Sequence, residues 1–195
     1  MNVYDFDNTI YDGESIVDFF LFCLKKDLKL IRYLPRIIFI LIKYKLNLVK
    51  IETITSFVEK FSYNFFEDNK TDYNKLAIEF WKKNSKKLKQ EFLENLKSDD
   101  LIITGCPNFL IKHIKDKLKA KNIICTIFNL ETKKLEFLCF GKNKVKIYKE
   151  KYGNKKINKF YTDSLADIPF MELSNEVYLV KNNTVKKIDK TQYIK

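Results

Sequence analysis

The sequence predicts an α/β protein: a doubly wound parallel sheet interrupted by a long α-helical insertion. A short apolar strand at residues 2–5 opens the chain, and about eighty residues of helical periodicity follow it. After residue 100, segments typical of strands and of helices alternate, which is the pattern of parallel strands joined by crossing helices. A chain of 195 residues is long enough for one core with a modest insertion.

Residues 15–96 form the helical block. Apolar residues recur at helical spacing in IVDFFLFCL, IRYLPRIIFILIKYKL, IETITSFVEKF and LAIEFWKKNSKKLKQEFLENL. Pro35 is expected to start or break a helix. The most apolar run, IIFILI at residues 37–42, is far shorter than the roughly 20 residues that cross a membrane, so we expect a buried helix and no membrane span. A stripe of aromatic side chains is assigned to the core of the insertion rather than to a substrate site: Phe19, Phe20 and Phe22.

The rest of the sheet is expected after the insertion. Runs rich in β-branched and aromatic residues predict the strands LIIT (101–104), NIICTIF (122–128), KINKFYTD (156–163), NEVYLV (175–180) and TVKKID (184–189). Helical periodicity predicts helices in PNFLIKHIKDKLKA (107–120) and KNKVKIYKEKYG (142–153), and ETKKLEFLCF (131–140) is expected to form a small β excursion.

The net charge of +12 does not indicate a nucleic-acid partner. It divides equally between residues 13–98 and the rest of the chain, so there is no basic tail. Lysine supplies almost all of it, because Arg32 and Arg36 are the only arginines, whereas nucleic-acid recognition relies on arginine forks. A solvated cationic surface is the expected result, with no nucleic acid bound.

The cysteines predict a reducing compartment. Four cysteines without C-x-x-C spacing and a single histidine argue against a zinc site and against a disulfide framework. The first strand begins at Asn2, which leaves no room for a secretory signal. A cytoplasmic location is therefore expected.

Two aspartates at the end of the first strand indicate the candidate site. Asp5 and Asp7 in VYDFDNTIYDGES would repel each other unless a cation lies between them, or unless one attacks while the other moves a proton. Thr104 and Asp163 are the last residues of two other predicted strands. Ligands of such sheets bind beyond the carboxyl ends of the strands, so these polar groups are expected to converge.

Four segments in order resemble the motifs of the haloacid dehalogenase (HAD) superfamily. DFDNT is similar to its first motif, DxDx[T/V]; LIITGCP to the second, a strand ending in Ser or Thr; GKNKV to the third, a lysine after a glycine turn; and YTDSLADIP to the fourth, DSxxD. The order of the motifs, with a long helical segment after the first, is similar to that of subfamily IB, the phosphoserine phosphatase-like branch. This resemblance implies a Rossmann-like HAD core from residues 1–13 and 99–195, with residues 14–98 as a helical cap.

The resemblance implies a phosphatase that forms an aspartyl-phosphate. Asp5 would be the nucleophile, because an attacking carboxylate needs cationic screening near a phosphate ester. Mg²⁺ would be held by Asp5, the backbone carbonyl of Asp7 and Asp163. The side chain of Asp7 would protonate the leaving oxygen and then deprotonate the hydrolytic water.

The remaining roles concern the phosphate and the supporting residues. Thr104 and the N–H of Gly105 would bind phosphoryl oxygens at a helix N-terminus, although Thr104 could equally be an N-cap. Lys144 would neutralise the nucleophile and the phosphate, with Lys142 and Lys146 as alternatives in a lysine-rich run. Asp167 would support the metal or orient the lysine, and Thr9 would tie down the loop.

The substrate is expected to be a small phosphorylated metabolite. Glu14 matches the glutamate that phosphoserine phosphatases use near the substrate amino group, although an acid favoured by a helix N-terminus is an equal alternative. Neither Arg32 nor Arg36 lies in a motif that would bind a carboxylate, so phosphoserine is expected to be a poor substrate. A phosphotransferase or mutase with the same intermediate, and a non-catalytic basic binding protein, are the alternatives.

Overall fold

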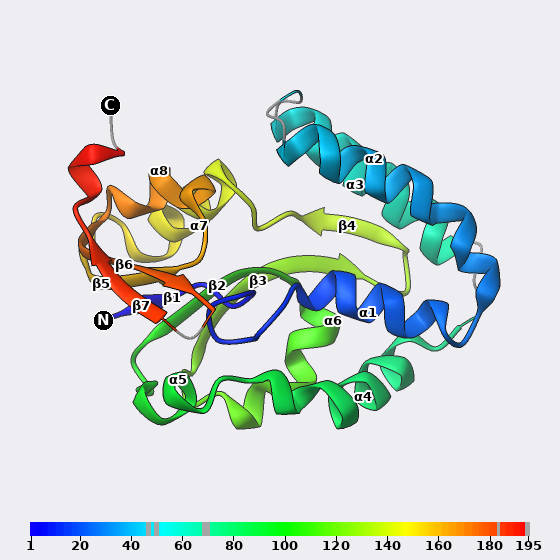
Figure 1. Cartoon of the computed structure of the whole chain (residues 1–195), viewed down its shortest axis with the longest axis horizontal. Helices are drawn as coiled ribbons and strands as arrows, with labels where there is room; N and C mark the ends of the chain where they lie inside the picture. The colour runs from blue at the N-terminus through cyan, green and yellow to red at the C-terminus, as the bar shows by residue number, and fades with distance from the viewer. Residues whose placement is uncertain (46–47, 49–50, 68–70, 183, 194–195) are drawn as a thin grey trace.

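The computed structural model describes residues 1–45, 48, 51–67, 71–182 and 184–193, which fold around one seven-stranded sheet (Figure 1). The strands are β1 Val3–Tyr4, β2 Leu101–Pro107, β3 Asn122–Asn129, β4 Lys134–Phe137, β5 Ile157–Thr162, β6 Ser174–Lys181 and β7 Thr184–Ile188. Their order across the sheet is β4-β3-β2-β1-β5-β6-β7. The predicted doubly wound α/β fold is confirmed.

The first strand lies in the centre of the sheet. Val3 pairs in parallel with Leu101 of β2 on one side and with Phe160 of β5 on the other. Only the edge strands β4 and β7 run antiparallel to their neighbours. The carboxyl ends of β1, β2 and β5 therefore meet at one edge, where the motif residues were expected to converge.

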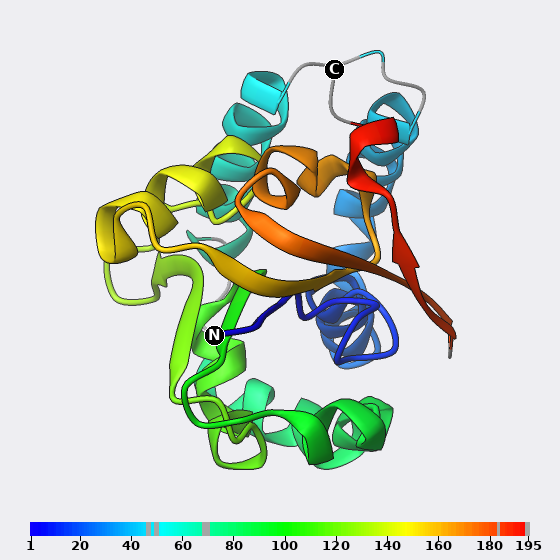
Figure 2. The ribbon, with the colours of Figure 1, turned by 90° about the vertical axis from the view of Figure 1, so that its left-hand side faces the viewer.

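Helices cover both faces of the sheet, with α7 and α8 on one face and α5 and α6 on the other (Figure 1, Figure 2). The α-helices are α1 Ser15–Leu24, α2 Leu34–Lys45, α3 Ile51–Glu67, α4 Tyr73–Asn84, α5 Gln90–Asn95, α6 Asn108–Ile111, α7 Lys142–Tyr152 and α8 Ile168–Met171. The 3₁₀ helices are η1 Leu28–Tyr33, η2 Ser85–Lys87, η3 Lys112–Lys117, η4 Leu165–Asp167 and η5 Lys190–Gln192.

Alternate residues of the central strands enter two different cores. Val3 and Leu101 pack in the cluster that contains Phe170 of α8, whereas Tyr4 and Ile102 pack in the cluster that contains α5 and α6 residues. Side chains of a strand point alternately to its two faces, so a strand covered on both faces reads as a continuous apolar run. The central strands were recognisable in the sequence for this reason.

Part of the insertion shares the core of the sheet. The indole Nε1 of Trp81 in α4 donates to the backbone carbonyl of Leu110 in α6 at 2.9 Å. The neighbouring Phe80 is fully buried, and its ring lies 5.5 Å from that of Phe19 and 5.8 Å from that of Phe22. The aromatic stripe of α1 is therefore core, as expected.

The helix expected at residues 107–120 differs from the prediction. Strand β2 continues to Pro107, which pairs with Thr126 beyond a register shift, and only then do α6 and the 3₁₀ turn η3 follow. Thr104 lies inside the strand, where its Oγ1 accepts the N–H of Cys106 at 2.9 Å. The expected helix N-terminus at Thr104 is wrong, because this local bond and the bulge prolong the strand.

The run IIFILI forms the middle half of α2, and Pro35 is the second residue of that helix, where proline is well tolerated. The expectation of a buried helix is wrong, because the exposed fractions of Ile38, Phe39 and Ile42 are 50%, 59% and 51%. One side of α2 faces the interior, and the opposite side faces solvent. Among the described helices, none is long and apolar enough to span a membrane.

Replacing Phe80 with alanine should lower the free energy of unfolding by about 3–5 kcal/mol, because the ring is fully buried among aromatic neighbours. Urea denaturation measures this loss. The control is Ile78→Ala in the same helix, whose 43% exposed side chain should cost under about 1 kcal/mol. Equal losses for the two variants would contradict the packing described here.

Candidate active site

A tight loop follows β1 and begins the site. The carbonyl of Phe6 accepts the backbone N–H groups of Ile10 and Tyr11, both at 2.9 Å, and Asn8 has a left-handed backbone with φ 54°. Gly13 closes the loop with φ 137°, and an added Cβ would lie 2.9 Å from a carboxylate oxygen of α1. Glycine is required there. The loop holds both motif aspartates at the carboxyl end of the strand.

Asp5, Lys144 and Asp167 form a buried ion cluster. The Lys144 ammonium donates to Asp5 Oδ1 at 3.0 Å and to Asp167 Oδ2 at 3.1 Å. The hydroxyl of Thr162, at the end of β5, also donates to Asp167 Oδ2 at 2.9 Å. Burial lowers the pKa of Lys144, but the charges of Asp5 and Asp167 outweigh it and hold that pKa above its usual value. The lysine is therefore charged at neutral pH.

The glycine turn of the third motif selects which lysine enters the site. Gly141 is the N-cap of α7 with φ 52°, and its carbonyl accepts the N–H of Lys144 at 3.1 Å. Lys142 and Lys146, the alternatives in the same run, are exposed. Lys144 is the lysine that contacts the aspartates.

Asp7 is placed at the start of α1. Its Oδ1 accepts the backbone N–H of Ser15 at 2.7 Å. Burial and the nearby charge of Glu14 raise the pKa of Asp7 to about 7, against the opposing effect of the Ser15 hydrogen bond. A carboxyl group with a pKa near neutrality can both give and accept a proton at physiological pH.

Asp163 and Glu14 lie at the same end of the sheet, joined by Asn8. The Asn8 amide donates to Glu14 Oε1 at 2.8 Å. Burial raises the pKa of Asp163, and a hydrogen bond from Asn8 opposes this shift. Burial and then the charge of Asp163 raise the pKa of Glu14. Glu14 is the N-cap residue of α1, but its side chain makes no capping bond.

Asn8 and Thr162 are site residues that the sequence analysis did not identify. Asn8 contacts Glu14 and lies beside Asp163, and Thr162 orients Asp167. Both are adjacent to motif aspartates, which is the only signal that could have found them. Their partners lie several residues away along the chain, so the contacts depend on how the loops fold.

Three further predicted residues have mixed outcomes. Thr104 is fully buried, and Gly105 after it lines an apolar cavity. Thr9 does not tie down the loop through its side chain: its Oγ1 is buried and has no hydrogen-bond partner among the described residues. Lys89 ties down the loop instead, because its Nζ donates to the backbone carbonyl of Asn8 at 2.9 Å.

The donor set fits a hard divalent cation. Burial raises the pKa of Asp5, Asp7, Glu14 and Asp163, while Lys144 is the one buried lysine among the described residues. A bound cation would offset this excess of negative charge, and carboxylate and carbonyl oxygens are the ligands that Mg²⁺ prefers. In the described part of the chain no three His, Cys, Asp or Glu side chains form a metal site by themselves. The predicted Mg²⁺ ligands are the carboxylates of Asp5 and Asp163 and the backbone carbonyl of Asp7, so the predicted site does not need three such side chains.

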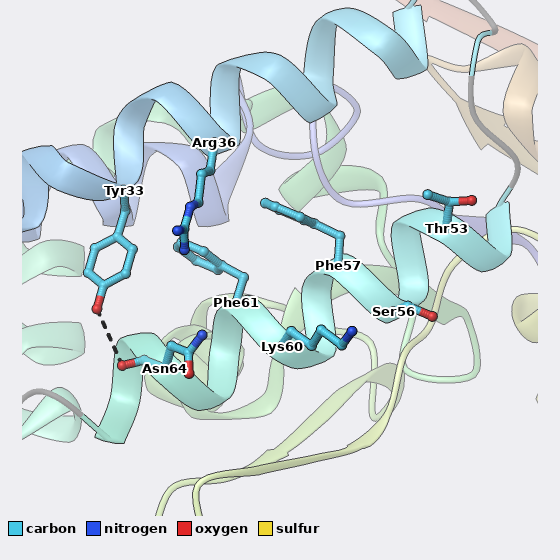
Figure 3. A pocket seen from close by; sticks show the side chains of 8 residues that line it. All are labelled: Tyr33, Arg36, Thr53, Ser56, Phe57, Lys60, Phe61 and Asn64. Atoms are coloured by element: carbon cyan, nitrogen blue, oxygen red, sulfur yellow. Dashed lines mark hydrogen bonds between the residues drawn. The ribbon is translucent and has the colours of Figure 1, made fainter.

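Neither arginine is among the groups that act on Asp5, Asp7 or Asp163 in the described part of the chain. Arg36 lines a pocket of about 380 Å³ between α2 and α3, and Figure 3 shows it pointing toward Phe61. Arg32 donates to the hydroxyl of Tyr33 at 3.1 Å. The forked cation that would bind a substrate carboxylate is absent from the described surroundings of Asp5.

Comparison with models of protein families shows the family to which the chain belongs. The model of the haloacid dehalogenase-like hydrolases matches residues 3–172, which include all four motifs. The chain belongs to this family. The predicted family and the enzyme class, a HAD hydrolase, are confirmed.

Two solved structures share the fold of this HAD hydrolase. A protein of unknown function from Bordetella pertussis Tohama I is 14% identical, with a TM-score of 0.68 and 91% of this chain and 87% of that chain covered. A phosphoserine phosphohydrolase-like protein from Francisella tularensis subsp. tularensis SCHU S4 is 19% identical, with a TM-score of 0.54 and coverages of 91% and 86%. No curated protein matches the sequence.

Lys144→Ala should lower the free energy of unfolding by about 3–5 kcal/mol, because it leaves the buried carboxylates of Asp5 and Asp167 without their cation. Thermal or urea unfolding measures the loss. Lys142→Ala and Lys146→Ala change exposed side chains and should alter stability by under about 0.5 kcal/mol. Similar losses at all three positions would show that the ion cluster is misassigned.

Proposed function

We propose that this HAD hydrolase is a Mg²⁺-dependent phosphomonoesterase that works through an aspartyl-phosphate. The observation that carries the proposal is Asp5 at the end of β1, held by the Lys144 ammonium at 3.0 Å, with Asp7 two residues further on. A carboxylate beside a fixed cation suits attack on an anionic ester. The phosphohydrolase-like name of the Francisella protein agrees with this activity.

Asp5 would act as the nucleophile. One of its oxygens forms a bond to phosphorus while the bond from phosphorus to the ester oxygen breaks. The Lys144 ammonium offsets the negative charge of the carboxylate and of the approaching phosphate, in a buried setting where such charges act strongly. Asp167 accepts a hydrogen bond from that ammonium, and the Thr162 hydroxyl in turn donates to Asp167.

Asp7 would move the protons. In its acid form it protonates the departing ester oxygen and so releases an alcohol. It then takes a proton from the water that attacks phosphorus, which releases inorganic phosphate and regenerates Asp5. A pKa of about 7 suits both halves of this cycle. The Ser15 N–H keeps the carboxyl oriented throughout.

Thr104 and Gly105 would bind the phosphoryl oxygens. Because Thr104 Oγ1 accepts a backbone N–H, its hydroxyl proton remains for donation to the phosphate. Mg²⁺ would be held by Asp5, Asp163 and the carbonyl of Asp7, and would supply positive charge that screens the transferred phosphoryl group.

Residues 14–98 would serve as the cap of the core formed by 1–13 and 99–195. Within that insertion α4 rests on the core through Trp81, so the covering role would fall to α1, α2 and α3. The free cysteines agree with a cytoplasmic location. A phosphotransferase or mutase would use the same residues, and a non-catalytic binding protein would not need them; no described contact favours either.

Asp5→Asn should reduce turnover of an aryl phosphate by several orders of magnitude, because an amide does not attack phosphorus. The amide can still accept the Lys144 hydrogen bond, so the fold should persist. Circular dichroism checks the fold, and mass spectrometry of the wild type, quenched during turnover, should find phosphate on the peptide that contains Asp5. Activity within tenfold of the wild type would refute the assignment.

Chelation should abolish activity reversibly. EDTA should remove turnover of the same aryl phosphate, and added Mg²⁺ should restore it, because the buried carboxylates need a cation for charge balance. The control is the enzyme returned to buffer without added metal. Turnover that is unaffected by EDTA would contradict the metal dependence, and no turnover under any condition would favour a binding protein.

A further inference from the structure

An apolar cavity of about 280 Å³ adjoins the candidate active site. It lies between α1, the α2–α3 pair and the strands β2, β3 and β4. Residues of all these elements line it, among them Val17, Phe20, Ile40, Val58, Phe65 and Phe128. The volume is near the lower end for small-molecule sites, which are roughly 300–1,000 Å³.

The lining carries almost no polar chemistry. Ser62 and Thr126 supply the only side-chain hydroxyls among the described lining residues, and none of these residues is charged. The Thr126 Oγ1 already accepts the N–H of Cys139 at 3.1 Å. A substrate ammonium or carboxylate placed here would lose its water without gaining a partner, which is costly. An alkyl or aromatic group would gain by burial.

The cavity is lined by chain neighbours of the proposed catalytic groups, and of the proposed site residues in the described part of the chain Gly105 is the one in its wall. Gly105 lines it and directly follows Thr104, and Ile16 lines it and directly follows Ser15, whose N–H binds Asp7 at 2.7 Å. The end of β2 that carries the proposed phosphate-binding N–H of Gly105 therefore borders the cavity, and Asp7 is linked to the cavity wall through Ser15, the neighbour of Ile16. An ester oxygen protonated by Asp7 would carry its leaving group into this space.

We propose that the leaving group of the substrate is apolar and occupies this cavity, so that the enzyme hydrolyses phosphomonoesters of hydrophobic alcohols. The proposal rests on the proposed phosphomonoesterase function. It also assigns a second role to Phe19 and Phe20, which belong to the core and form part of the cavity wall. The phosphate stays with Asp5, and the product alcohol leaves from the cavity.

A series of primary n-alkyl phosphates from ethyl to octyl tests the proposal, because chain length changes while the chemistry of the leaving oxygen stays the same. The value of kcat/KM should rise about fourfold with each added methylene until the cavity is filled. Phosphoserine should be among the poorest substrates. A flat or falling series, with ethyl phosphate hydrolysed, would overturn the inference and leave the phosphatase function standing.

Binding separates the inference from the proposed activity. Calorimetry with the Asp5→Asn variant and Mg²⁺ should show octyl phosphate binding at least tenfold more tightly than ethyl phosphate. Equal affinities would overturn the inference even if the enzyme proved inactive toward every ester. Tighter octyl binding without turnover in the wild type would support the cavity and refute the phosphatase function.

Variants of the cavity wall provide the matched control. Val58→Thr keeps the shape of the side chain but adds a hydroxyl to the wall, and Val58→Asp adds a charge. The octyl-to-ethyl ratio of kcat/KM should fall several-fold in the first and more than tenfold in the second. Val185→Thr and Val185→Asp, on the exposed edge strand β7, should leave the ratio unchanged. An unchanged ratio in folded Val58→Thr would contradict the proposal.

Discussion

One buried lysine facing two carboxylates is the constraint on which the arrangement of the site depends. Lys144 lies 139 residues from Asp5 along the chain, and Asp167 comes from a third segment. A buried ion cluster is tolerated only when its geometry is held closely, since unpaired charge in the interior is costly. The central position of β1 and the glycine turn before α7 both serve to bring these groups together.

The charge of the site is opposite to that of the whole chain. The protein carries a net +12, yet Asp5, Asp7, Glu14 and Asp163 are grouped at one end of the sheet, and burial raises the pKa of each. A cationic surface favours the approach of an anionic ester over long distances. Close to the carboxylates, the same ester needs local positive charge, which Lys144 and a bound cation would supply.

The insertion divides into parts with different packing. Helices α1 and α4 share aromatic contacts with the core, where Phe80 and Trp81 are buried. The α2–α3 pair borders the apolar cavity together with α1, and α2 also exposes Ile38 and Phe39 to solvent. The candidate catalytic groups lie at the carboxyl end of the sheet and in the first turn of α7, and helices of the insertion enclose the apolar space together with β2, β3 and β4.

The sequence by itself determined the fold class, the order of the elements and the four motif segments, because hydrophobic periodicity and residue spacing are local properties. The sequence favoured Lys144 over Lys142 and Lys146. Only the tertiary structure showed its ammonium against Asp5, Thr104 inside a strand, and Asn8 between two acids. It also decided that apolar side chains from distant helices and strands enclose a cavity beside the site. These features arise from contacts between segments far apart in the chain, and no local pattern records them.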